Sequence, residues 1–177
     1  MMRKYERMQS NILITENKKD EKFLRKKTAD FNFKKFTKKE VNALIARMKR
    51  IMKEANGVGL SANQVGLNFR MFVAEVPSGR QNQNKFYAVF NPKVEKFGAE
   101  KIILEEGCLS VPLSYGDVER AEKVALKGQD KNGKNIKIKA WGLLARVFQH
   151  EVDHLEGKLF IDKARNIHKA ETSSNSR

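Results

Sequence analysis

The sequence predicts an α+β fold, in which antiparallel strands pack around one central C-terminal helix and one further helix lies nearer the N-terminus. Two segments, 38–55 and 142–156, carry apolar residues at helical spacing. Short apolar or alternating runs, typical of strands, follow one another between them. Because strands and helices do not alternate along the chain, a parallel α/β sheet is not expected.

The chain of 177 residues is long enough for one domain with a substantial core. With 40% hydrophobic and 32% charged residues, its composition is that of a globular protein. We expect a single domain over residues 1–169. A flexible C-terminal tail is expected over residues 170–177, which are rich in Ser and Asn.

The first predicted helix runs from about Lys38 to Ala55. Thr37 and Glu40 form the capping-box pattern that begins a helix, and Asn56-Gly57 supplies its stop. One apolar stripe repeats at helical spacing between these ends, and we expect it to belong to the core. The stripe consists of Val41, Leu44, Ile45, Met48, Ile51 and Met52.

Several strands are predicted between the two helices. The Asn132-Gly133 turn signal joins the last two strands into a hairpin. In the second arm Ile136, Ile138 and Ala140 alternate with polar residues, so one face of that arm is expected to be buried and the other exposed. The predicted strands are 69–76, 86–91, 101–104 and the hairpin arms 118–127 and 134–140.

The second predicted helix runs from about Gly142 to Glu156, and Gly157 follows as its stop. Its inward face begins with aliphatic side chains and ends with polar ones. The residues that recur three or four positions apart are Leu143, Leu144, Val147, Glu151 and His154, with His150 on an adjoining line.

The sharpest local pattern in the chain is H-E-x-x-H at residues 150–154. Residues four apart on a helix share one face, so His150 and His154 can hold one metal ion. A divalent metal lowers the pKa of a water toward neutrality, and the Glu151 carboxylate can then take its proton. The alternative is a polar surface segment with two chance histidines. It is disfavoured because two of the chain's three histidines lie here, on a helix with an apolar inner side.

A catalytic site of this type needs a third protein ligand and an open position. Where one class of peptidases has a third histidine, this chain has Phe160, which cannot ligate a metal. Glu171 and His168 lie in the polar C-terminal segment, where a surface position is the better interpretation. The remaining candidate is Cys108, upstream of the helix.

Cys108 is the single cysteine of the chain and therefore forms no intramolecular disulfide, which suits a reducing cytosol. It follows an apolar strand, and the adjacent Gly107 allows a close backbone approach to a ligand. A metal-bound thiolate stays ionised without a separate base. Taken alone, however, the cysteine is better interpreted as a small buried core residue.

The segment 57–66 follows the first helix and contains three glycines, small residues and Gln64. This composition indicates backbone packed tightly against a site. A phosphate-binding loop is the rival interpretation. It is rejected because the segment lacks the Lys-Ser/Thr ending and the helix precedes the glycines.

Taken in order, three segments resemble those of peptide deformylases. The resemblance covers most of the chain, from about Ile12 to Ile161, and each motif alone is less specific than the ordered set. It implies a hydrolase that removes the formyl group from the N-terminal formylmethionine of new polypeptides. The segments are G-V-G-L-S-A-N-Q at 57–64, E-G-C-L-S at 106–110 and Q-H-E-V-D-H at 149–154.

The same resemblance implies the metal centre and its base. Cys108, His150 and His154 would be the ligands of one divalent ion. Fe²⁺ would be the physiological metal, and Zn²⁺, Ni²⁺ or Co²⁺ could substitute for it. Glu151 would take the proton of the attacking water and return it to the leaving amine.

The resemblance also implies how the substrate is bound. The side-chain amide of Gln64 and the backbone N–H of Leu109 would meet the oxyanion together with the metal. The Gly59 backbone would form a hydrogen bond with the substrate.

Further residues are assigned by their place in these motifs. An apolar pocket for the methionine side chain would be lined by Val58, Leu143 and Val147. Glu106 and Arg120 would form a structural charge pair near the site.

The chain departs from the family pattern at several positions. Ser61 stands where the family more often has Ala, and Leu113 stands where Gly is common. Tyr115 falls where many members carry an Arg that helps to hold the substrate backbone, which affects binding beyond methionine. The stretch 11–27 lacks the usual proline-rich lead. None of these changes a ligand or the base.

The formal net charge of +15 favours a polyanionic partner. We expect weak electrostatic association with the ribosome, while a lysine-rich solvated surface is the alternative. The apolar runs are too short to span a membrane, and residues 1–10 lack the apolar core of a secretory signal. The expected location is the cytoplasm, with an organelle as the alternative, and the expected assembly is a monomer.

Two rival functions remain at this stage. One is a structural metal site or binding module without turnover, which would need a fourth protein ligand. The other is a peptidase that cleaves internal peptide bonds, whose activity would not depend on Cys108.

Overall fold

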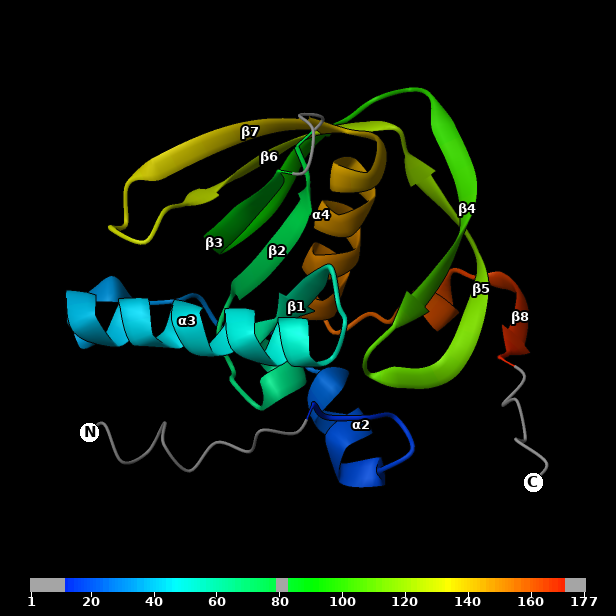
Figure 1. Ribbon diagram of the computed structural model, residues 1–177, viewed down its shortest axis with the longest axis horizontal. Helices are drawn as coiled ribbons and strands as arrows, with labels where there is room; N and C mark the ends of the chain where they lie inside the picture. The colour runs from blue at the N-terminus through cyan, green and yellow to red at the C-terminus, as the bar shows by residue number, and fades with distance from the viewer. Residues whose placement is uncertain (1–11, 79–82, 171–177) are drawn as a thin grey trace.

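The computed structural model describes residues 12–78 and 83–170, and its fold is the predicted α+β arrangement (Figure 1). Helix α4 (Gly142–Leu155) stands between a larger and a smaller antiparallel sheet. Helix α3 (Lys38–Glu54) lies across the far side of the larger sheet. The central helix predicted to carry H-E-x-x-H is therefore confirmed.

The two sheets have different strand orders. The larger sheet has the order β1 (Gly59–Ser61), β2 (Met71–Pro77), β3 (Asn84–Phe97), β6 (Lys123–Gln129) and β7 (Asn135–Trp141). The smaller sheet has the order β4 (Lys101–Cys108), β5 (Val111–Ala121) and β8 (Arg165–Lys169). Short 3-10 helices cover Phe33–Lys35 (η1), Ala62–Val65 (η2) and Phe160–Asp162 (η3).

Helix α3 begins with the predicted capping box. The Thr37 hydroxyl accepts a hydrogen bond from the Glu40 backbone N–H at 3.2 Å, and the Thr37 N–H donates to the Glu40 carboxylate at 2.8 Å. The helix ends at Glu54, one residue before the predicted end. Its apolar stripe packs against the larger sheet, as the helical spacing predicts.

Strand β2 lies in the centre of the core because both of its faces are buried. Met71 and Val73 pack in the cluster beneath α3, whereas Phe72 and Ala74 pack in the cluster beneath α4. A strand covered on both faces has no polar alternation, which explains its continuous apolar run. This strand fixes the positions of both helices relative to β1.

The predicted strand 118–127 is wrong as a single hairpin arm. The chain changes sheets at Glu122, so that β5 ends at Ala121 in the smaller sheet and β6 begins at Lys123 in the larger one. Val118 and Val124 are both buried, in different clusters. The apolar pattern of the sequence therefore continues through Glu122 and does not reveal that the chain changes sheets there. The hairpin between β6 and β7, with its turn at Asn132-Gly133, is confirmed.

Three short elements have no counterpart among the predicted ones: α2 (Lys18–Leu24), β1 and β8. Strand β8 pairs with β5 and places His168 opposite Tyr115, so His168 lies in an ordered strand rather than in a frayed end. The tail predicted over 170–177 lies, apart from Ala170, outside the described residues. No helix in the described ranges is long and apolar enough to cross a membrane.

Candidate metal centre

The metal-ligating residues predicted from the sequence come together in the structure. Cys108 lies at the end of β4, and His150 and His154 lie one turn apart on α4. Their potential ligand atoms all lie within 4.8 Å of one another, with Cys108 Sγ 3.1 Å from His154 Nε2. One sulfur and two imidazole nitrogens form a donor set suited to Zn²⁺, Fe²⁺ and neighbouring transition metals.

Glu106 holds His150 from the side away from the other ligands. His150 Nδ1 lies 3.0 Å from Glu106 Oε2, which leaves Nε2 of the ring for a metal. Arg120 donates two hydrogen bonds of 2.9 Å to the two oxygens of the same carboxylate, so the predicted Glu106–Arg120 pair is confirmed. Arg120 also contacts Asp153, which is held in turn by Lys163.

Arg146 is a functional residue that the sequence reasoning missed. Its Nη1 donates to Glu106 Oε1 at 2.6 Å and to the Val118 carbonyl at 3.0 Å. Its Nη2 donates to the Ile102 carbonyl at 2.7 Å. Its position in the sequence could have indicated this role. Arg146 lies four residues before His150 on the buried side of the helix, and a buried arginine needs an anionic partner.

The charges of this cluster shift the ionisation of its members. Burial opposes the Glu106 carboxylate, but the hydrogen bonds from Arg120 and His150 hold its pKa well below the usual range. Burial also opposes the Cys108 thiolate, yet the adjacent His154 and His150 lower the pKa of this thiol. Against burial, contacts with Cys108 and Glu106 raise the pKa of His150 to about 10. A proton on His150 therefore competes with a metal, and metal binding is expected to release protons.

Glu151 is buried on the inner face of α4 and is held by β1. The Ser61 hydroxyl lies 2.7 Å from Glu151 Oε2 and 2.9 Å from the Glu151 carbonyl. Burial raises the pKa of this carboxyl, while the two histidines and Ser61 counteract the rise. A Cβ added at Gly59 would overlap Glu151 Oε1, so the position needs glycine to let the strand pass this close to the carboxylate.

Gln64 lies in η2 with its side chain fixed in one orientation. Its Oε1 accepts a hydrogen bond from the Ser61 N–H at 2.8 Å. Its Nε2 donates to the Ser110 hydroxyl at 3.1 Å and lies 3.7 Å from Cys108 Sγ. The amide N–H group therefore faces the ligand cluster, beside Leu109, the next residue after Cys108.

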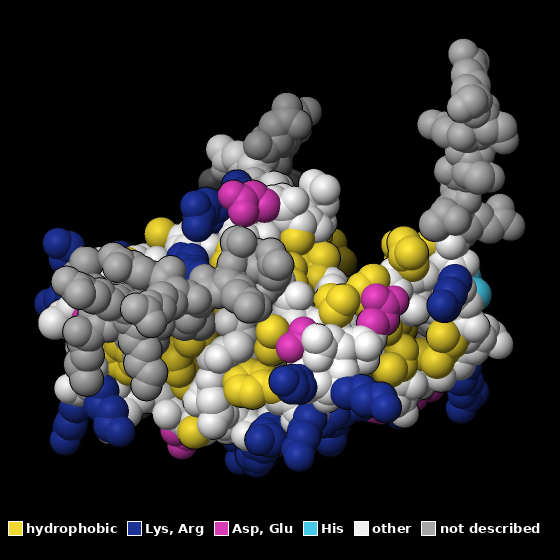
Figure 2. All heavy atoms as spheres, turned by 90° about the horizontal axis from the view of Figure 1, so that it is seen from below, with side chains coloured by type: hydrophobic (Ala, Val, Ile, Leu, Met, Phe, Trp, Pro, Cys, Tyr) yellow, Lys and Arg dark blue, Asp and Glu magenta, His cyan; other side chains and the backbone are white. Residues whose placement is uncertain are grey.

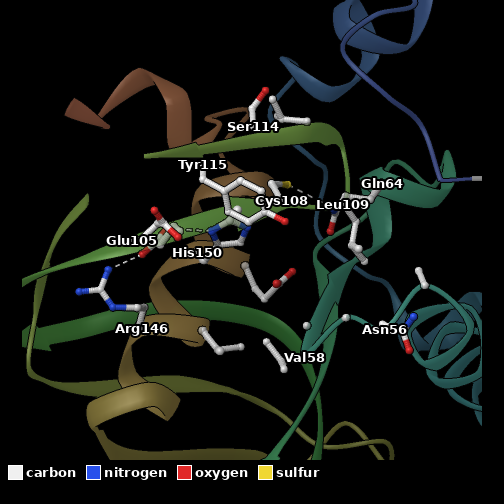
Figure 3. A pocket seen from close by; sticks show the side chains of 18 of the residues that line it. Asn56, Val58, Gln64, Glu105, Cys108, Leu109, Ser114, Tyr115, Arg146 and His150 are labelled. Carbon is white, nitrogen blue, oxygen red and sulfur yellow. Dashed lines mark hydrogen bonds and ion pairs between the residues drawn. The ribbon is translucent and has the colours of Figure 1, made fainter. Parts of the chain in front are cut away.

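A cavity of about 590 Å³ opens in front of these residues (Figure 3). Its lining includes Gln64, Cys108, Leu109, His150 and Glu151. The three residues predicted to surround a methionine side chain also line it, and they are Val58, Leu143 and Val147. The cavity thus joins the metal ligands to an apolar wall, and β4, β5, β1 and α4 each contribute to it.

A helix-borne H-E-x-x-H beside a cysteine that can supply a third ligand, set at the end of a cavity, is an arrangement suited to a metal-dependent hydrolase. Among the described residues, the group that can hold a metal consists of these three ligands, which leaves a coordination position for water. The chain belongs to the polypeptide deformylase family, whose model matches residues 13–170. Its activity is the metal-dependent removal of the formyl group from the N-terminus of nascent polypeptides.

Individual relatives support this membership. The peptide deformylase of Halothermothrix orenii is 46% identical over 129 residues, which are 73% of this chain and 80% of the relative. Peptide deformylase 1B, chloroplastic, of Solanum lycopersicum is 41% identical over 152 residues, which are 86% of this chain but 49% of that protein. A probable peptide deformylase from synechococcus phage S-SSM7 superposes with a TM-score of 0.77 at 38% identity, covering 86% of this chain and 98% of the phage protein.

Proposed function

We propose that this enzyme deformylates formylmethionine with Fe²⁺ held by Cys108, His150 and His154, and with Glu151 as the base that moves the proton. The proposal is carried by one observation: the three ligand atoms lie within 4.8 Å of one another at the end of a cavity that Glu151 also lines. When bound, the ion supplies Lewis acidity for the attacking water and for the formyl carbonyl.

Glu151 is suited to shuttle the proton between water and amine. Its carboxylate is buried beside both histidines, Ser61 fixes one of its oxygens, and the residue lines the cavity. Burial raises the pKa of the carboxyl, which makes it a better proton acceptor than an exposed glutamate. It takes the proton from the attacking water and delivers it to the leaving amine.

Gln64 and the backbone N–H of Leu109 stabilise the oxyanion. The contact from the Ser61 N–H fixes the Gln64 amide, so its N–H group faces the reaction without reorganisation. The Gly59 backbone lies against Glu151 at the edge strand β1, where an extended peptide can form a hydrogen bond with it. The methionine side chain occupies the wall formed by Val58, Leu143 and Val147.

The decisive test replaces Glu151. Glu151→Gln keeps the size of the side chain but removes the proton acceptor, so we expect metal binding to persist and deformylation to fall by about 10³-fold or more. Formate release from formyl-Met-Ala-Ser, measured anaerobically with iron, reports the activity. Glu156→Gln, at the C-cap of the same helix, loses pairs with the buried Arg70 and the exposed Lys27 and is the matched control. Full activity of Glu151→Gln would refute the proposed mechanism.

The identity of the metal is tested by reconstitution. We expect the highest activity with Fe²⁺ under anaerobic conditions, lower or comparable activity with Ni²⁺ or Co²⁺, and loss of the iron form in air. A Co²⁺ sample should show thiolate absorption that disappears in Cys108→Ser. Cleavage of internal peptide bonds that persists in Cys108→Ser would instead identify a peptidase.

We also propose a weak association with the ribosome. Lysine and arginine side chains line the margins of the face shown in Figure 2, and the net charge is +15. Binding through such charges is released as salt rises, so co-sedimentation with ribosomes should be strong at low and weak at high ionic strength. Co-sedimentation that ignores salt would count against this proposal.

The proposed assembly is a monomer, because one chain supplies the ligands, the base and the apolar wall. Sedimentation equilibrium at micromolar concentration tests this directly. The proposed location is the cytoplasm, where formylated chains are made, with an organelle as the alternative that the chloroplastic relative illustrates.

A further inference from the structure

Strand β8 places a second group of side chains at the mouth of the cavity. Tyr115 on β5 lines the cavity and is 38% exposed, and Figure 3 shows its ring above His150, between Glu105 and Cys108. His168 on β8 is the register partner of Tyr115, and the two rings stack at an angle of 27° with their centroids 6.1 Å apart. None of these contacts belongs to the ligand cluster.

The ring of Tyr115 contacts residues on both neighbouring strands. A Cβ added at Gly107 would lie 2.8 Å from Tyr115 Cε1, so the ring rests directly on the glycine that precedes the ligand Cys108. His168 covers the ring from the side of β8. The aromatic face is therefore held at the cavity wall by two neighbours rather than by the core.

Glu105 supplies a charge beside this ring. Its carboxylate lines the cavity, and its Oε2 lies 3.3 Å from His168 Nε2. The other charged side chains of the lining are engaged in the site itself: Glu106 pairs with Arg146, and Glu151 is buried against Ser61. Glu105 is 54% exposed at its side chain, so it is the carboxylate that a substrate can reach from solvent.

We propose that Tyr115 and Glu105, positioned by His168, form a subsite that favours a basic side chain two residues after the formylmethionine. A lysine or arginine there gains an ion pair with the Glu105 carboxylate and a cation–π contact with the exposed Tyr115 ring. This inference rests on the proposed function, because it concerns the same cavity. His168 acts as a positioning residue, since it touches Tyr115 and Glu105 rather than the reacting atoms.

The subsite acts through substrate binding. It lies at the mouth, away from the scissile formyl group, so its contacts are the same in the ground state and in the transition state. The preference should therefore appear in KM, with kcat little changed. For exposed contacts of this kind we expect a ratio of kcat/KM of about three- to tenfold between basic and acidic peptides.

The experiment measures deformylation of three amidated peptides, formyl-Met-Ala-Lys, formyl-Met-Ala-Ser and formyl-Met-Ala-Glu, by the iron-loaded full-length chain. The expected order of kcat/KM is Lys, then Ser, then Glu. In Glu105→Gln the difference between the Lys and Glu peptides should disappear, and in His168→Ala it should shrink. His168→Phe, which can stack but cannot pair with Glu105, should retain a larger Lys preference than His168→Ala.

Glu119→Gln is the matched control. Glu119 lies on the same sheet, pairs with Lys101 at 2.9 Å and is 53% exposed at its side chain, but it does not line the cavity. This variant loses the same charge and should keep the full Lys preference. If Glu119→Gln and Glu105→Gln reduced the Lys preference equally, the subsite would be refuted. The preference would then arise from the overall charge of the protein.

Formyl-methionine amide has no residue beyond methionine, so its deformylation tests the proposed function without involving the subsite. If the wild-type chain deformylates this compound but shows no preference among the three peptides, the subsite is wrong and the proposed function stands. If the iron-loaded chain does not deformylate this compound or any peptide, the proposed function fails and the subsite falls with it.

Discussion

The site has a buried inner part and an exposed rim, and the two differ in how their side chains are held. The inner part is called the base of the site below, as distinct from the proton-accepting side chain of Glu151. Every member of the base is at most 8% exposed and hydrogen-bonded to a neighbour, whereas the rim residues are between 38% and 53% exposed. The base consists of Ser61, Glu106, Arg120, Arg146 and Glu151, and the rim of Val58, Leu113, Tyr115 and Leu143.

The difference assigns separate tasks to the two parts. Buried, hydrogen-bonded polar groups keep one arrangement, which the proposed proton transfer requires of Glu151 and the candidate ligands. Exposed apolar side chains at a cavity mouth gain burial only when a peptide covers them, so they contribute to binding. Changes to the base should therefore lower metal affinity or kcat, and changes to the rim should raise KM.

After that of Glu151, the largest effect expected in the base of the site comes from Glu106. Glu106→Gln removes the charge that two arginines and His150 share, so we expect metal affinity or activity to fall by about 10- to 100-fold. The free energy of unfolding should fall by about 3 kcal/mol, because the buried guanidinium of Arg146 loses its counter-charge and that of Arg120 keeps only Asp153. Chelator competition and urea unfolding measure these changes, and Glu119→Gln, at an exposed pair, should alter neither. If metal affinity and activity were both unchanged, Glu106 would have no role in supporting the metal site.

A pair of substitutions on α4 tests the rim directly. Leu143 is 50% exposed and Val147 is 5% exposed, although both line the cavity. Leu143→Ala should raise KM for formyl-Met-Ala-Ser about three- to tenfold with unchanged stability. Val147→Ala should raise KM and also lower the free energy of unfolding by about 1 to 2 kcal/mol, because its side chain belongs to the core. Equal stability losses in both variants would contradict the distinction.

The sequence predicts the base and the rim unequally well. His150 and His154 follow from helical spacing, since residues four apart on α4 share one face, and Glu151 follows from the H-E-x-x-H pattern. Arg146 does not follow, because its partners lie on β4 and β5 and three elements must converge before its role is visible. The resemblance places Tyr115 near the substrate, but its contact with His168 escapes prediction, because β8 is short, polar and indistinguishable from a tail.

The change of sheets at Glu122 shows the same limit in the fold. Periodicity reports which face of a strand is buried, but not which sheet it is buried against. Ala121 and Val124 both read as inward positions, although their strands belong to different sheets. Two elements are predicted correctly from short sequence patterns, the Thr37 capping box and the Asn132-Gly133 turn. Their conformations depend on neighbouring residues and not on distant ones.

A smaller effect is expected at Ser61, which supports the base without carrying charge. Its hydroxyl contacts Glu151 Oε2, so Ser61→Ala frees the carboxylate to leave its position toward the cavity. We expect kcat to fall about three- to tenfold with unchanged KM, and Ser61→Thr to restore most of it. Steady-state kinetics with formyl-Met-Ala-Ser provide the measurement, and a change confined to KM would place Ser61 with the rim instead.

The smallest effect is expected for a charge pair that lies outside both the base and the rim of the site. It shows how much less a partly exposed pair contributes to stability than a buried one. Asp162 accepts hydrogen bonds from Arg25 at 2.6 and 2.7 Å, and its side chain is 36% exposed. Although partial burial opposes ionisation, the Arg25 contact lowers the pKa of this carboxyl below its usual value. The folded protein therefore holds this proton less tightly than the unfolded chain does. The resulting stability is present above the unfolded pKa of about 3.9 and is lost as the pH falls through the lower folded value.

Asp162→Asn should consequently lower the unfolding free energy slightly near neutrality and flatten its decline below about pH 4, where the wild type loses the same contribution. Urea unfolding of the metal-free chain over a series of acidic pH values measures the slope for the wild type and the variant. Solvent screens a pair at this exposure, so the difference should be much smaller than that for Glu106→Gln. A loss at neutral pH as large as that of Glu106→Gln would mean that burial does not distinguish the base from the periphery.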